Sequence, residues 1–294
     1  MLMLLLLFLT GMLAGTVDAI AGGGGLISMP ILMSVGLPPH VAFGTNKLQS
    51  SIGTMMAARR YWRAGWISLR DIIPGLTYGF FGAATGAVLN QIISGDILKK
   101  IVPVMLLIIF AYTLLSPRFG NDDQKPRINS EIFYLLFGFT LAFYDGFFGP
   151  GVGAFWVFLL MFFLGYNLIK ATAYTKVFNL NSNLVALICF AAGSNIDYKI
   201  GFCMAAGQII GGQIGAGLAI RNGVKLIRPL FLTMVFVTIS TLAYRNYGGG
   251  LLKLIAFSQH KSTYVPAFIA VLLVLTVFLI RRFQHGSQQA LDRF

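Results

Sequence analysis

The fold is best predicted from two stretches of the sequence, Asp18-Ala-Ile-Ala-Gly22-Gly-Gly24-Gly and Asp145-Gly-Phe-Phe-Gly149-Pro-Gly151-Val. In both, an aspartate inside a strongly apolar segment precedes a glycine cluster by the same spacing. Glycine and proline interrupt an apolar helix and leave backbone N–H and C=O groups that need partners in a bilayer. The repeated interruption predicts two related halves, each with a broken helix.

Further landmarks recur in the same order along the chain. Ala42-Phe-Gly-Thr-Asn-Lys47-Leu-Gln-Ser50 aligns with Ala171-Thr-Ala-Tyr-Thr-Lys176-Val-Phe-Asn179, and Leu98-Lys99-Lys-Ile-Val-Pro103 aligns with Val224-Lys225-Leu-Ile-Arg-Pro229. We therefore expect a first membrane repeat at 1–115, a polar linker at 116–130, a second membrane repeat at 131–245, and an extra hydrophobic span with a polar tail at 246–294.

The composition makes the bilayer the expected solvent. The chain of 294 residues is 57% hydrophobic and 11% charged, which leaves too little polar surface to cover a soluble globule. A spanning helix needs about 20 mostly apolar residues. The apolar blocks are 2–20, 41–58, 72–93, 101–115, 132–164, 171–192, 201–220, 227–243 and 265–280. These predict an all-α polytopic membrane protein with about four spans in each half and one extra C-terminal span.

Charge and motifs exclude several classes of function. The net charge of +13 comes from Lys and Arg that lie mainly in the connections between apolar blocks, which is typical of membrane topology rather than of nucleic-acid binding. The chain contains no ATPase motif, and His40, His260 and His285 have no metal-ligand partner at useful spacing. We therefore expect no cofactor and no metal, and we expect any active transport to use an ion gradient or the membrane potential.

The aspartates of the two breaks need an explanation, because a carboxylate at membrane depth is costly unless it is paired, protonated or hydrated. One interpretation makes Asp18 and Asp145 proton-coupling or gating groups. The other makes each an N-cap for the helix that restarts after the glycine break. The sequence leaves both open.

Two lysines occupy equivalent positions in apolar stretches and have small polar neighbours. A symmetric pair of cations surrounded by hydroxyl and amide groups suits an anion, whereas pairing of each lysine with Asp18 or Asp145 would be structural; the two interpretations are compatible. The glycine clusters could add backbone N–H groups at a helix start, while the other glycines along helix faces fit close helix packing. The candidate substrate-binding residues are Lys47, Lys176, Thr45, Asn46, Gln49, Thr175, Asn179, Gly23, Gly24 and Gly151.

On these motifs the chain resembles the TauE/SafE family of membrane transporters, also described as sulfite or organosulfonate exporters. The motifs are the first aspartate-glycine stretch, Gly44-Thr-Asn-Lys47-Leu-Gln, Tyr144-Asp145-Gly-Phe-Phe-Gly149-Pro, and Ala171-Thr-Ala with Lys176 and Asn179. The resemblance covers about residues 5–245 and implies a multi-pass protein of the bacterial inner membrane with about eight spans. It also implies a substrate such as sulfite, sulfoacetate, thiosulfate or a related anion.

Three hypotheses for function follow. The first is a secondary transporter that exports a small anion, with the two lysines holding the substrate and the two aspartates coupling or gating its movement. The second is a membrane-embedded enzyme acting on a lipid-linked phosphate, for which the aspartates are the only intramembrane candidates for a base or nucleophile. The third is an assembly partner of another membrane complex, which leaves the intramembrane charges without a use.

Overall fold

The computed structural model describes residues 2–68, 71–92, 122–223, 226 and 230, all within the unit Met1–Leu242. The predicted blocks at 101–115 and 265–280, most of the block at 227–243, the first part of the linker and the segment 246–294 lie outside the described residues. All regular structure in the described residues is helical, as the composition predicts.

The helices follow in two runs along the chain. The first run is α1 (Leu2–Ala21), α2 (Gly24–Ser34), α3 (Pro39–Arg63) and α4 (Ile73–Asn90). The second run is α6 (Ser130–Phe133), the short π-helix η2 (Tyr134–Gly138), α7 (Phe139–Phe147), α8 (Val152–Leu164), α9 (Leu168–Ala192) and α10 (Tyr198–Asn222). Among the described helices, α1, α9 and α10 are long and apolar enough to cross a membrane.

The first glycine cluster ends α1, and the chain then folds back on itself. Gly22 has a φ of +74°, a conformation that glycine adopts without the steric cost of a Cβ. Met29 and Leu32 of α2 belong to the same apolar cluster as Leu7, near the start of α1, so α2 returns along α1. Pro30 lies inside α2 and does not end it, so the glycines alone make this break.

The second glycine cluster divides the long block at 132–164 in the same way. The chain is non-helical between α7 and α8, where Gly149 and Gly151 have φ values of +87° and +89°. The ring centroids of Tyr144 and Phe155 lie 5.7 Å apart beside the break, and those of Phe137 and Phe163 lie 5.0 Å apart further away. These contacts show that α8 runs back along α7 and η2.

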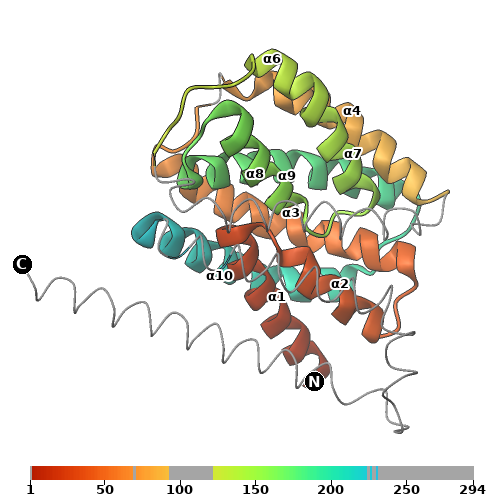
Figure 1. The fold of residues 1–294 in the computed structure, drawn as a ribbon. Coiled ribbons are helices and arrows are strands. Elements are labelled where there is room, and N and C mark those ends of the chain that lie inside the picture. The colour runs from red at the N-terminus through yellow and green to blue at the C-terminus, as the bar shows by residue number, and fades with distance from the viewer. Residues whose placement is uncertain (1, 69–70, 93–121, 224–225, 227–229, 231–294) are drawn as a thin grey trace, which may run out of the picture. The chain divides into compact units, whose positions relative to one another are not determined.

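The helices α3 and α9 pack against each other (Figure 1). They carry most of the buried polar residues that the structure describes. Helices α1 and α10 pack together beside α3, and α4 and α7 pack together beside α9. In both pairs, α1 with α10 and α4 with α7, the two backbones come into contact at glycines. A Cβ on Gly211 would lie 2.0 Å from the Met12 carbonyl oxygen, and a Cβ on Gly86 would lie 2.1 Å from that of Phe143. The glycines along these helix faces therefore serve close packing, as the sequence predicts.

Candidate functional site

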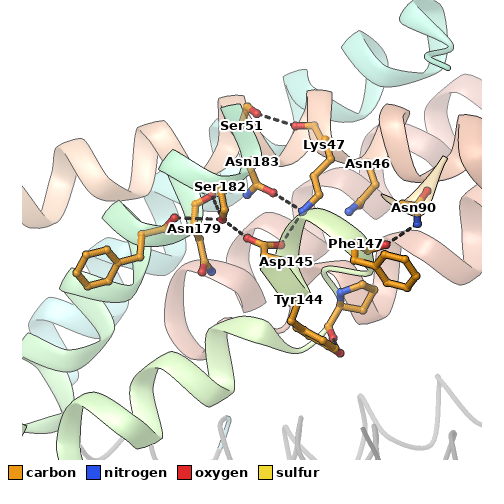
Figure 2. Close-up of polar contacts among 12 residues, drawn as sticks. Asn46, Lys47, Ser51, Asn90, Tyr144, Asp145, Phe147, Asn179, Ser182 and Asn183 are labelled. Carbon is orange, nitrogen blue, oxygen red and sulfur yellow. Dashed lines mark hydrogen bonds and ion pairs between the residues drawn. The ribbon is translucent and has the colours of Figure 1, made fainter. Parts of the chain in front are cut away.

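Lys47 is a buried cation on α3 that reaches across to two other helices. Its side chain is 2% exposed, and its Nζ donates to Asp145 Oδ1 at 2.6 Å and to Asn183 Oδ1 at 3.0 Å (Figure 2). Asp145 lies in the last turns of α7, and Asn183 lies on α9. A buried charge is tolerated only when it is paired and hydrogen-bonded, and both conditions hold for this ammonium group.

Asp145 has a second hydrogen-bond donor besides Lys47. Its second carboxylate oxygen, Oδ2, accepts a hydrogen bond from the Ser182 hydroxyl on α9, and its side chain is 3% exposed (Figure 2). The described residues show no side-chain cap at the start of α8, so Asp145 is an ion-pair partner rather than an N-cap for that helix.

Lys176 forms a second ion pair, with Asp18 at the end of α1. Its Nζ donates to Asp18 Oδ2 at 3.1 Å and also to the backbone carbonyl of Asp18. The other carboxylate oxygen of Asp18 accepts from the Gly24 backbone N–H, at the first residue of α2, over 3.4 Å. Asp18 therefore neutralises a lysine and also receives an N–H group from the restarted helix.

The ion pairs cross between the two runs of helices. Lys47 from the first run binds the aspartate of the second break, and Lys176 from the second run binds the aspartate of the first. The breaks themselves touch, since a Cβ built on Gly22 would lie 2.6 Å from the Gly153 Cα. Two interrupted helices, one buried ion pair and one partly buried ion pair therefore meet in one place.

A small polar cavity of about 30 Å³ lies at this meeting point. It is lined by Asp18, Gly22, Gly25, Asn46, Lys47, Ser50, Thr54, Asp145, Gly149, Gly151, Val152, Asn179 and Asn183. Val152 is the one apolar side chain in this lining that is larger than glycine. The volume suffices for a water molecule, so a polyatomic ion would enter only if some of the side chains around the cavity moved.

The structure brings some of the predicted site residues to the cavity and places others behind it. Lys47, Asn46, Asn179, Gly151 and both aspartates line the cavity. Lys176, Gly23, Gly24, Thr45, Gln49 and Thr175 do not line it.

The residues behind the cavity have other partners. The Thr45 hydroxyl accepts from the Asp197 backbone N–H at 2.9 Å, where α10 begins, and the Thr175 hydroxyl donates to the Ala171 carbonyl at 2.8 Å within α9. Gln49 supports the cavity wall from outside, because its Nε2 donates to Asn46 Oδ1 at 2.8 Å. The Ser28 hydroxyl donates to the same oxygen at 2.6 Å, so two donors fix the Asn46 amide.

Seven residues that line the cavity, and one that supports it, were not among the predicted site residues. The lining residues are Gly22, Gly25, Ser50, Thr54, Gly149, Val152 and Asn183, and the supporting residue is Ser182. Ser50 and Thr54 follow Lys47 by three and seven positions, and Asn179 and Asn183 follow Lys176 by the same intervals. Positions i, i+3 and i+7 lie on one face of a helix, so this spacing was the signal that predicts Ser50, Thr54 and Asn183. Ser182, which holds Asp145, has no counterpart in the first run, where Gly53 occupies the equivalent position.

The described residues form helices long and apolar enough to cross a membrane, with two helix breaks and two ion pairs that meet in one place. These are features of a membrane transporter. The chain belongs to the sulfite exporter TauE/SafE family, which matches residues 7–242 and confirms the resemblance seen in the sequence. No solved structure matches the chain.

Relatives in several bacteria support the class. A probable membrane transporter protein of Haemophilus influenzae is 43% identical over 82% of this chain and 95% of its own length. The probable membrane transporter protein YfcA of Escherichia coli K12 is 39% identical over 84% of this chain and 92% of its own length. The probable membrane transporter protein YdhB of Bacillus subtilis is 24% identical over 79% of this chain and 96% of its own length. The protein is therefore a membrane transporter.

Proposed function

We propose that the protein is a secondary transporter that exports a small anion, such as sulfite, a sulfonate or a related organic anion, across the bacterial inner membrane. The observation that carries this proposal is the buried ammonium group of Lys47 on the wall of a cavity lined by amide and hydroxyl groups and by the carboxylates of Asp18 and Asp145. An anion in that cavity would meet a charge-assisted donor and neutral donors together, which is the chemistry of oxyanion recognition.

The proposed architecture is two repeated halves that both contribute residues to one central site. Helices α1, α2, α3 and α4 would correspond in order to α7, α8, α9 and α10. The packing supports this correspondence, because α1 contacts α10 as α7 contacts α4, and α3 contacts α10 as α9 contacts α4. Sites at the junction of two repeats, formed by interrupted helices, are typical of secondary transporters.

The proposed mechanism is an exchange of partners at the lysines. In the state described here, Asp145 and Asp18 occupy the ammonium groups of Lys47 and Lys176, and the cavity is closed around about 30 Å³. An arriving anion would compete with a carboxylate for a lysine. Because each ion pair joins helices from both runs, breaking one pair would release the contact between the runs and let the cavity widen. The aspartates would in this way gate the movement of the substrate.

The driving force is an ion gradient or the membrane potential. An inside-negative potential by itself favours export of an anion, by about 2.3 kcal/mol for each charge and 100 mV. A proton carried by Asp18 or Asp145 would add a dependence on the pH gradient. These sources are separable by experiment, because a potential and a pH gradient can be imposed independently on vesicles.

The test is flux of a panel of anions, including sulfite, thiosulfate and methanesulfonate, into proteoliposomes that contain the full-length protein. Flux is compared with and without an imposed pH gradient, with and without a potential, and between the wild type and Lys47→Gln. We expect saturable flux of at least one anion in the wild type and its loss in the variant. Equal flux in Lys47→Gln protein that remains folded in the membrane would contradict the proposal.

A further inference from the structure

The two lysines are equivalent in the sequence but are held in different ways. We infer that Lys47 is the residue that binds the transported anion directly, and that Lys176 is a positioning residue that fixes Asp18 in the cavity wall. This inference rests on the proposed function and deepens it, because it assigns different tasks to the two halves of the site.

An anion that enters the cavity can reach Lys47 but not Lys176. The Lys47 side chain lines the cavity, and both of its partners, Asp145 and Asn183, line the same cavity. Both partners are side chains, so they can rotate away and leave the ammonium group to an anion. Lys176 does not line the cavity, and its side chain is fully buried, with an exposed fraction of 0%.

Lys176 has a hydrogen-bond partner that cannot rotate away, because that partner is a backbone group. It donates to the backbone carbonyl of Asp18 in the last turn of α1, and the same carbonyl accepts the Gly22 N–H at 2.8 Å. A cation at the C-terminal end of a helix is favourable because it meets the negative end of the helix dipole. Lys176 therefore has a stabilising position that requires no substrate.

The two aspartates differ in the hydrogen-bond donors that they would keep if their lysines moved away. If Lys47 turns to an anion, Asp145 keeps a hydrogen bond from the Ser182 hydroxyl. If Lys176 left Asp18, the hydrogen bond that remains to that carboxylate among the described residues is the one from the Gly24 N–H at 3.4 Å. The position equivalent to Ser182 is Gly53, where a Cβ would lie 2.1 Å from Gln208 Oε1 and 2.8 Å from Gln208 Cβ. The Gln208 Cβ cannot rotate away, so a side chain at Gly53 would require α10 to shift. Among the described residues, Asp145 therefore keeps a hydroxyl donor when its lysine turns away, and Asp18 has no equivalent hydroxyl donor.

The experiment compares two matched variants, each of which removes one whole ion pair and leaves no uncompensated charge. Lys47→Gln with Asp145→Asn removes the first pair, and Lys176→Gln with Asp18→Asn removes the second. Initial flux of radiolabelled sulfite, thiosulfate and methanesulfonate into proteoliposomes gives KM and the maximal rate for each. Thermal unfolding in detergent verifies that both variants fold, and Lys176→Arg tests rescue by a conservative cation.

The first variant should lose saturable flux or show a KM raised on the order of 30-fold or more, because it has lost a charged contact to the anion. The second should keep KM within about threefold and lose maximal rate, and Lys176→Arg should recover most of that rate. A second variant whose KM rises as much as that of the first, or whose maximal rate is unchanged, overturns the inference while the proposed function stands. Absence of wild-type flux for all three anions overturns the proposed function and this inference with it.

Discussion

Gly22 and Gly153 meet backbone to backbone, so that a Cβ on Gly153 would lie 2.5 Å from the Gly22 Cα. One glycine belongs to the break between α1 and α2, and the other is the second residue of α8. The contact draws both breaks to the same point, and Asp18, Asp145 and the cavity lie around it. The absence of side chains at these positions is therefore what lets two interrupted helices share one site.

Replacement of Gly153 by alanine tests this contact, and Gly25→Ala is its matched control. Gly25 and Gly153 are each the second residue of their helix, α2 and α8, so alanine brings a similar gain in helix propensity at both. The nearest atom to a Cβ on Gly25 is the Pro150 Cα at 3.3 Å, which requires only a small shift. We expect Gly153→Ala to be less stable than Gly25→Ala by about 1–3 kcal/mol, measured by unfolding in detergent. Equal stability of the two variants would show that the breaks can separate freely.

The ion pair between Lys47 and Asp145 makes a separate prediction about stability. Lys47→Met leaves a buried carboxylate with only the Ser182 hydroxyl, and an uncompensated buried charge costs about 3–5 kcal/mol. The double variant Lys47→Met with Asp145→Asn removes that charge and should recover most of the loss, although it should not transport. Unfolding of the two variants is compared with that of the wild type. If the double variant is as unstable as the single one, the cost comes from lost packing of the lysine stem and not from charge.

The sequence was sufficient to predict the charged residues and the helix breaks that meet at the candidate site. Asp18, Asp145, Lys47 and Lys176 are conspicuous because charges inside apolar segments are costly and so require partners. The glycine clusters are equally conspicuous, because four consecutive glycines exceed what close helix packing needs. The all-α fold follows from the length and apolar character of the blocks. The division into two repeats stays a prediction that the helix packing supports.

The way in which these residues pair could not be predicted from the sequence. The same repeated motifs allow each lysine to pair with the aspartate of its own half or of the other, and only the packing of α3 against α9 fixes the crossed pairs. Sequence adjacency also favoured Thr45 and Thr175, the near neighbours of the two lysines. Successive helix residues point about 100° apart, so these threonines face other partners. Asn183 and Thr54 lie further away in sequence but on the correct face.

The packing of α4 against α7 predicts different costs at two glycines of one helix. A Cβ on Gly86 would meet the Phe143 backbone oxygen at 2.1 Å, whereas a Cβ on Gly79 would first meet the Asn181 side-chain nitrogen at 3.0 Å. Backbone cannot yield without separating the helices, while a side chain can rotate. Gly86→Ala should therefore be destabilised by about 1–3 kcal/mol relative to Gly79→Ala, measured by thermal unfolding in the same detergent. Two equally stable variants would indicate that the helix pair tolerates separation.

On the proposed function, the composition of the cavity lining predicts which anions the protein carries well. Val152 is the one apolar side chain larger than glycine in that lining, so an alkyl tail would find little apolar surface there. In an apolar pocket each buried methylene would contribute about 0.8 kcal/mol, and here that contribution is missing. Flux in proteoliposomes should therefore fall along a series from methanesulfonate to hexanesulfonate, with sulfite and thiosulfate at or above the first member. Flux that rises with chain length would instead place the substrate in a larger, apolar part of the molecule and would separate transport from the cavity around Lys47.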